Sequence, residues 1–80
     1  MKQALVYSKE NCSYCTKAKN LLTLDNISYE ETVIGEDITR EDFMSLFPDQ
    51  KSVPLIFGNG EKIGGYNELL DYLSRKPTFE

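Results

Sequence analysis

The sequence predicts an α/β domain with a four-stranded mixed sheet and three helices, in the order β-α-β-α-β-β-α. Two patterns lead to this fold class. In the first half of the chain, short apolar runs alternate with helical segments, as in a β-α-β unit with parallel strands. In the second half, two short runs flank Gly58-Asn59-Gly60, a sequence typical of an antiparallel hairpin turn. We expect one domain over residues 1–80, with helices on both faces of the sheet.

The β-α-β unit begins with a predicted strand over residues 3–7 and a predicted helix over residues 13–24. Four residues of this helix recur at helical spacing and should form its apolar face, namely Cys15, Ala18, Leu21 and Leu22. Lys19 is expected to point away from that face. The second strand, over residues 27–33, is rich in β-branched and aromatic residues in partial alternation.

A second helix is predicted after Thr39, which suits an N-cap, with Asp42 three residues later as a variant capping box. Ile38 and Phe43 occupy the two positions of a hydrophobic staple. The helix carries Phe43, Met44, Leu46 and Phe47, and Pro48 ends it.

The hairpin strands are predicted at residues 55–57 and up to Ile63, and Gly64-Gly65 then leads into the last helix. Its apolar residues fall at i, i+3, i+4 and i+7, namely Tyr66, Leu69, Leu70 and Leu73. Three residues are expected to end this helix, two cations suited to its negative end and a proline: Arg75, Lys76 and Pro77.

The composition excludes several classes of protein. A net charge of -4 argues against a general nucleic-acid binder, and no apolar stretch approaches the length of a membrane span. With no charged-then-apolar leader at its start, we expect a cytoplasmic protein. The chain has no histidine, which removes Cys-His catalytic pairs, and two cysteines cannot alone complete a structural zinc site. No metal site within one chain is therefore expected.

The most informative motif is Cys12-Ser13-Tyr14-Cys15, which follows the first strand and opens the first helix. The amides and the dipole at a helix N-terminus favour a thiolate, which is the attacking species in disulfide exchange. Redox chemistry is favoured over metal binding, and a structural pair is the third possibility. A small chaperone for Cu(I) also presents this motif between a first strand and helix.

Four segments together resemble the glutaredoxin family: Tyr7-Ser8-Lys9, Cys12-Ser13-Tyr14-Cys15, Ser52-Val53-Pro54-Leu55-Ile56-Phe57 and Ile63-Gly64-Gly65-Tyr66. They occur in the family's order and at its approximate spacing over nearly the whole chain. The resemblance implies the thioredoxin fold. It also implies a cytoplasmic, monomeric enzyme that uses glutathione to reduce protein disulfides or glutathione-mixed disulfides, with ribonucleotide reductase as one plausible client. A copper chaperone would need neither the Val53-Pro54 nor the Gly64-Gly65 segment.

The resemblance makes Cys12 the nucleophile and Cys15 the residue that resolves the mixed disulfide. Cys12 precedes the helix, and Lys9 adds a nearby cation. Such surroundings lower the pKa of a thiol from about 8.5 to roughly 3.5–7.5. Cys15 lies one turn further on and should be less exposed. Mixed disulfides with glutathione need only the first cysteine in this family, whereas protein disulfides commonly need both.

The other motif positions resemble a clamp for glutathione. By this resemblance, Val53 pairs with the ligand through its backbone, beside Ser52 and a cis Pro54. Lys9 and Lys51 would meet ligand carboxylates, and Tyr14 would pack over the bound thiol. The remaining contacts would come from the start of the last helix, at Gly65, Tyr66 and Asn67, whose amides suit an anion.

Three residues depart from the usual family pattern. Ser13 replaces a proline, which relaxes the loop and adds a hydroxyl that could reach a thiolate. Some members without this proline bind a [2Fe–2S] cluster between two protomers, through Cys12 of each and two glutathiones. Ser52 replaces a threonine, and little change is expected from it. The neutral Asn67 stands where an acidic residue or serine is frequent, which should weaken the binding of the ammonium group of glutathione.

A thioredoxin-like reductant recharged by a flavoenzyme remains the nearest alternative function.

Overall fold

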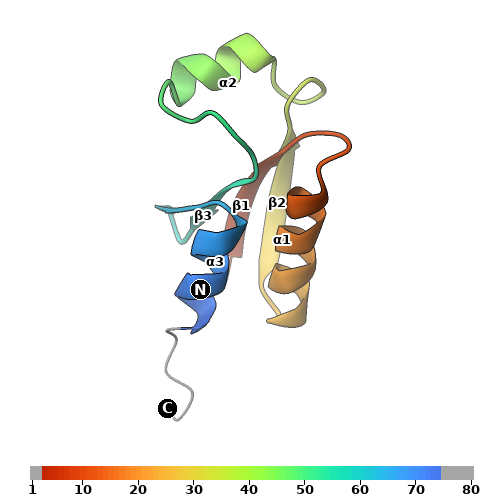
Figure 1. Cartoon of the computed structure of the whole chain (residues 1–80), viewed down its shortest axis with the longest axis vertical. Helices are drawn as coiled ribbons and strands as arrows, with labels where there is room; N and C mark the ends of the chain where they lie inside the picture. Colours follow the sequence, from red (N-terminus) through yellow and green to blue (C-terminus); the bar gives the residue numbers. More distant parts are fainter. Residues whose placement is uncertain (1–2, 75–80) are drawn as a thin grey trace.

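The computed structural model describes residues 3–74 and contains four strands and three helices in the predicted order (Figure 1). The elements are β1 (Gln3–Ser8), α1 (Ser13–Leu24), β2 (Ser28–Val33), α2 (Arg40–Leu46), β3 (Leu55–Gly58), β4 (Glu61–Gly64) and α3 (Tyr66–Ser74). The residues predicted to end the last helix, Arg75, Lys76 and Pro77, lie outside the described residues.

The four strands form one mixed sheet in the order β2-β1-β3-β4. β1 and β2 are parallel and are joined by α1, as the β-α-β pattern predicts. β3 runs antiparallel to both β1 and β4. The carboxyl end of β1 therefore meets the start of β3. At this end of the sheet, the Cys12–Cys15 motif that follows β1 comes close to the Val53-Pro54 segment that precedes β3.

The turn between β3 and β4 confirms the predicted hairpin. Asn59 and Gly60 are its two central residues, and both have positive φ, 52° and 83°. Type I′ turns require this left-handed backbone at both positions, because their twist matches that of the flanking strands. Asparagine and glycine are the residues that adopt it at least cost.

The main core lies between one face of the sheet and the helices α1 and α3. Alternate residues of β1 point into it, and their partners come from both helices and from β3. The cluster of buried residues consists of Ala4, Val6, Ala18, Leu22, Ile27, Ile56 and Leu69. Leu70 was predicted to lie on the apolar face of α3. This prediction was wrong, because Leu70 is 42% exposed. Leu69 is the one fully buried residue of this helix, and Tyr66 and Leu73 are partly buried against the core.

The helix α2 attaches to the opposite face of the sheet through aromatic rings. Tyr7 and Phe57, from β1 and β3, surround Phe47 at centroid distances of 5.2 and 5.7 Å. Phe43 lies 5.4 Å from Tyr7 and is the one buried residue of α2. The rest of the helix lies beyond the ends of the strands, at the top of Figure 1. Helices were predicted on both faces of the sheet, but within residues 3–74 this second face has helical cover only where Phe43 and Phe47 contact it.

The start of α2 confirms the predicted cap. The side chain of Thr39 accepts a hydrogen bond of 3.0 Å from the backbone amide of Asp42. This bond satisfies one of the amides that a helix N-terminus leaves unpaired. Of the apolar residues that this helix carries, Met44 and Leu46 are more than half exposed.

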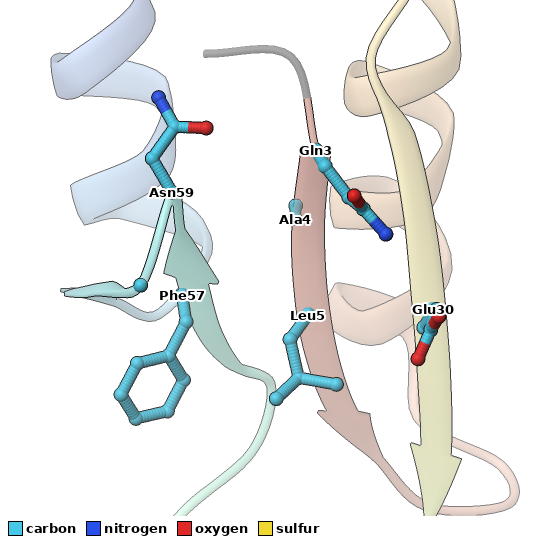
Figure 2. A pocket seen from close by; sticks show the side chains of 7 residues that line it. Gln3, Ala4, Leu5, Glu30, Phe57 and Asn59 are labelled. Carbon is cyan, nitrogen blue, oxygen red and sulfur yellow. The ribbon is translucent and has the colours of Figure 1, made fainter.

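The uncovered sheet face holds a shallow hollow of about 380 Å³ at the end far from the cysteines (Figure 2). Leu5 and Phe57, which are cross-strand partners, form its apolar floor. Gln3, Glu30 and Asn59 surround them. Between residues 3 and 74 there is no helix with the length and apolar character needed to span a bilayer.

Candidate functional site

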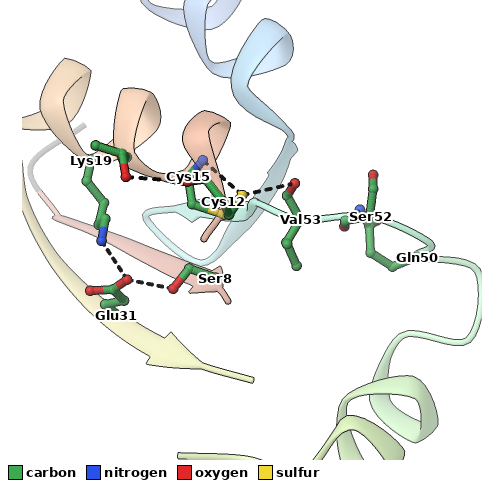
Figure 3. The surroundings of a disulfide bond; sticks show 9 residues. Ser8, Cys12, Cys15, Lys19, Glu31, Gln50, Ser52 and Val53 are labelled. Carbon is green, nitrogen blue, oxygen red and sulfur yellow. Dashed lines mark hydrogen bonds and ion pairs between the residues drawn. A yellow bond between two sulfur atoms is a disulfide. The ribbon is translucent and has the colours of Figure 1, made fainter. Parts of the chain in front are cut away.

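Cys12 and Cys15 form a disulfide at the N-terminus of α1, with their Cα atoms 5.2 Å apart (Figure 3). Cys12 is the N-cap residue, and its sulfur accepts a hydrogen bond of 3.2 Å from the amide of Cys15. Cys12 is partly exposed, whereas Cys15 is 1% exposed on the inner face of the helix. The predicted difference in exposure is confirmed, so an attacking sulfur from another molecule reaches Cys12 first.

The loop before the helix explains why Cys12 occupies the cap. Asn11 has a positive φ of 58°, which turns the chain sharply between β1 and α1. Asparagine tolerates this left-handed conformation better than most residues. The carbonyl of Cys12 then accepts hydrogen bonds from the amide and the hydroxyl of Thr16. In the described part of the chain, the hydroxyl of Ser13 does not reach the sulfur of Cys12, which is instead served by the Cys15 amide.

The Val53-Pro54 segment lies directly beside the disulfide. The peptide bond between these residues is cis, as the family resemblance implied. The carbonyl oxygen of Val53 is 3.9 Å from the sulfur of Cys12. Pro54 is buried, while Val53 is only partly covered. The backbone of Val53 is thus open to a molecule joined to Cys12, next to the reacting sulfur.

The start of α3 approaches the same segment. A Cβ atom on Gly65 would lie 3.5 Å from the carbonyl oxygen of Pro54, an ordinary van der Waals contact, so the residue before α3 lies against this segment. Gly64 has a φ of 125°, and its absent side chain leaves room for Glu68. The carboxylate of Glu68 accepts a hydrogen bond of 2.9 Å from the amide of Gly65. The amide of Gly65 is therefore already taken, which leaves those of Tyr66 and Asn67 as the candidate anion site.

Two tyrosines lie side by side between α1 and α3. The rings of Tyr14 and Tyr66 are 5.9 Å apart, and the ammonium group of Lys17 lies 5.1 Å above the Tyr14 ring. Tyr14 is 53% exposed, whereas Tyr66 also packs against the core. Tyr66 is therefore partly a core aromatic as well as a residue at the edge of the site.

The structure divides the predicted clamp between two sides. Lys9, Lys51, Ser52 and Val53 line one groove of about 560 Å³, which also extends along α2. Tyr14 lies with the start of α3, as described above. Their joint role in binding a ligand stays a prediction. Among the described residues, no three cysteine or carboxylate side chains converge to hold a metal ion.

A buried polar group beside the cysteines was missed by the sequence analysis. The hydroxyl of Ser8, 1% exposed, donates a hydrogen bond of 2.6 Å to the carboxylate of Glu31. The ammonium group of Lys19 lies 2.8 Å from the same oxygen. All three residues line an open groove of about 630 Å³ with Cys12 and Cys15 (Figure 3).

Lys19 is not among the buried residues of α1, in keeping with the prediction, but its ammonium group turns toward the β2 carboxylate at this groove, which was not predicted. One signal was present in the sequence. Lys19 follows Cys15 by four residues, and residues at this spacing lie on the same side of a helix. Its partner Glu31 lies on β2, and no local sequence pattern predicts that the two residues meet.

Glu31 should make the stability of the domain depend on pH. The hydrogen bonds from Lys19 and then Ser8 lower the pKa of Glu31 below its ordinary value of 4.5. A lowered folded-state pKa means that the stabilisation is present above about pH 4.5 and is lost as the pH falls through the folded-state pKa. We expect Glu31→Gln to lower the free energy of unfolding at pH 7, with the two proteins converging in acid.

Urea unfolding at a series of pH values from 3 to 7 would measure this difference. Glu30→Gln is the matched control, since Glu30 is the exposed neighbour on β2 and its carboxylate makes no ion pair with the described residues. A difference between wild type and Glu31→Gln that stays constant through acid would contradict the assignment.

The comparisons with known proteins agree with this geometry. The profile of the glutaredoxin family matches residues 4–63. Glutaredoxin 3 of Escherichia coli K12 is 34% identical over 64 residues, which cover 80% of this chain and 77% of that protein. The hybrid peroxiredoxin hyPrx5 of Haemophilus influenzae is 33% identical over 69 residues, and the match covers 86% of this chain. This chain spans only 28% of that longer protein.

A solved structure carries the same fold. The buckwheat glutaredoxin, determined as a glutathione complex, superposes with a TM-score of 0.69 at 25% identity. The match covers 89% of this chain and 67% of the buckwheat chain. The thioredoxin fold, the dithiol pair at the start of α1 and the family match lead to one conclusion. The chain belongs to the glutaredoxin family.

Proposed function

We propose that this thiol-disulfide oxidoreductase draws its electrons from glutathione and reduces protein disulfides and glutathione-mixed disulfides. The observation that carries the proposal is the position of Cys12. Its sulfur caps α1, is reachable from solvent, and lies 3.9 Å from the Val53 carbonyl oxygen. A glutathionyl group on Cys12 would lie along the open backbone of Val53. The solved glutathione complex of the buckwheat relative supports this choice of ligand.

The reaction begins when the Cys12 thiolate attacks one sulfur of a client disulfide. A mixed disulfide forms, and the second client sulfur leaves as a thiolate that takes up a proton. Cys15, once deprotonated, attacks the Cys12 sulfur and forms the disulfide between Cys12 and Cys15. The client sulfur that Cys12 had attacked leaves as a thiolate and takes up a proton. Two glutathiones then reduce this disulfide and leave as one oxidised glutathione. The client gains two electrons and two protons in total.

The Cys15 amide assists both directions of this exchange. Its hydrogen bond to the Cys12 sulfur, together with the helix dipole, stabilises negative charge on that atom. Cys12 is therefore a good attacking group and also a good leaving group when Cys15 attacks. Because Cys15 is buried against the core side of α1, its reach is restricted to Cys12.

Lys51 is proposed to meet a carboxylate of glutathione from the groove beside Val53. It is exposed, and among the described residues it has no ion pair. An exposed ion pair contributes about 0.2–1 kcal/mol, and a reversed charge adds repulsion of similar size. We expect Lys51→Glu to raise the KM for a glutathione-mixed disulfide about two- to thirtyfold, with kcat little changed.

Steady-state rates coupled to glutathione reductase and NADPH would measure this effect. Lys62→Glu is the matched control, because Lys62 is an exposed lysine on β4 that lines neither groove at the cysteines. Equal KM values for the two variants would remove Lys51 from the proposed clamp. No glutathione-dependent turnover by the wild type would remove the proposed function itself.

Three further parts of the proposal come from the family resemblance. We propose a monomer, a cytoplasmic location and clients that include ribonucleotide reductase. A [2Fe–2S] cluster would need Cys12 from two chains and two glutathiones, since Cys15 is buried. We do not propose the cluster as a second function, because the replacement of the usual proline by Ser13 is its one indication and no further observation among the described residues favours it.

A further inference from the structure

The groove beside Val53 extends well past the residues assigned to glutathione. It begins at Lys9 and Val53, next to Cys12, and continues to Arg40 and Met44 on α2. Neither α2 residue belongs to a motif of the predicted clamp. Their side chains are exposed, with Met44 51% accessible. The groove therefore offers binding surface that a tripeptide on Cys12 does not explain.

The charge of this groove contrasts with that of the whole chain. The chain carries 13 acidic and 9 basic residues and a net charge of -4. The groove, however, is lined by three cations and by no carboxylate. Those cations are Lys9, Arg40 and Lys51, and none of them makes an ion pair with another described residue. A positive groove on an acidic protein selects a partner that carries negative charge.

Apolar side chains line the same groove, namely Ile34, Phe43 and Met44. Met44 is the most exposed of the three, at 51%. Methionine side chains adapt to differently shaped apolar partners. A free carboxylate ligand would gain nothing from these apolar side chains. A polypeptide with both carboxylates and an apolar side chain matches the cations and the apolar lining together.

We propose that this groove docks the client polypeptide, specifically a segment with acidic residues and one apolar side chain next to the cysteine under attack. This inference rests on the proposed function and adds the class of protein client to it. The segment would run from the mixed disulfide at Cys12 past Val53 toward α2. Glutathione would use the Cys12 end of the groove afterwards, so Arg40 and Met44 would serve the client alone.

The test uses two synthetic peptides of equal length in which serine replaces the target cysteine. One has glutamates and a leucine around that position, and the other has lysines in place of the glutamates. We expect the acidic peptide to shift the amide NMR signals of Arg40 and Met44, and the basic peptide to leave them unchanged. Since no disulfide is involved, this result does not depend on glutathione chemistry.

Two matched pairs of variants locate the contact. Arg40→Glu should weaken binding of the acidic peptide about tenfold, a change of about 1.4 kcal/mol, whereas Lys62→Glu should not. Met44→Ser should weaken it, whereas Leu46→Ser should not, because Leu46 is as exposed on α2 but does not line the groove. Added salt should weaken binding by the wild type and affect Arg40→Glu less.

A second experiment measures steady-state kinetics. Its substrates are the disulfide forms of both peptides and a small glutathione-mixed disulfide. Arg40→Glu should raise the KM for the acidic peptide about tenfold and leave turnover of the small substrate unchanged. Equal binding of the two peptides by the wild type, or equal effects of Arg40→Glu and Lys62→Glu, would overturn the docking proposal. If the wild type has no activity on the small glutathione-mixed disulfide, the glutathione proposal is overturned. The peptide titration then decides the docking proposal by itself.

Discussion

Cys12→Ser is expected to lower activity on every disulfide substrate by at least about 10³-fold, the order found when an enzyme loses its nucleophile. Cys12 is the exposed sulfur of the pair and the one capped by a backbone amide. A serine hydroxyl at the same position stays protonated at neutral pH and cannot form a disulfide. The remaining cysteine, Cys15, is 1% exposed and so cannot take over the attack on a disulfide in another molecule.

Cys15→Ser is expected to separate the two classes of substrate. A glutathione-mixed disulfide on Cys12 can be resolved by a second glutathione from solvent, so activity on small mixed disulfides should be largely retained. A protein client attached to Cys12 shields that sulfur from solvent. Its release depends on Cys15, which is buried behind Cys12, and activity on protein disulfides should fall.

Both variants would be measured with the same two substrates in the glutathione-coupled assay. Since Cys15 is 1% exposed, a serine there buries a hydroxyl, and Cys15→Ala serves as a second variant without that group. Circular dichroism would confirm that each variant is folded. Retained activity in Cys12→Ser, or loss of the small-substrate activity in both folded Cys15 variants, would contradict the assigned roles.

Leu69→Ala is expected to produce the largest loss of stability among single substitutions on α3. Leu69 is fully buried and connects this helix to the core formed by α1 and the sheet. Truncation of a buried leucine to alanine costs about 2–5 kcal/mol, against a total stability of about 5–15 kcal/mol for a domain. For a domain of this size the midpoint of thermal unfolding should fall by about 8–40 °C.

Leu70→Ala is the matched control on the next residue of the same helix. Leu70 is 42% exposed, so the same change of side chain removes little buried area. We expect a loss of less than about 1 kcal/mol in urea unfolding, because alanine also favours the helix. Similar losses at the two positions would show that α3 does not pack as described.

The elements could be predicted because their signals are local. Thr39 caps α2 through a bond to an amide three residues away, and Asn59-Gly60 forms its turn from its own backbone preferences. The exposure difference between Cys12 and Cys15 follows from one turn of helix. Each of these features is decided within a few residues, where capping, turn chemistry and helical spacing suffice.

The groups around the cysteines could not be predicted in the same way. Glu31 meets Ser8 across 23 positions of sequence, and their contact depends on the pairing of β1 with β2. The aromatic cluster that fixes α2 likewise joins three separate elements through Tyr7 and Phe47. Leu70 fits the helical spacing, but among the apolar residues of α3 only Leu69 is fully buried. Such outcomes depend on how elements pack, which spacing alone does not contain.

We propose that glutathione returns the electrons to the Cys12–Cys15 disulfide. The most direct test starts from the oxidised wild-type protein and follows NADPH consumption in two parallel reactions. One contains glutathione and glutathione reductase, and the other contains a thioredoxin reductase flavoenzyme without glutathione. We predict rapid reduction in the first reaction and little in the second. Rapid reduction by the flavoenzyme with none by glutathione would contradict the proposal and identify the chain as a thioredoxin-like reductant.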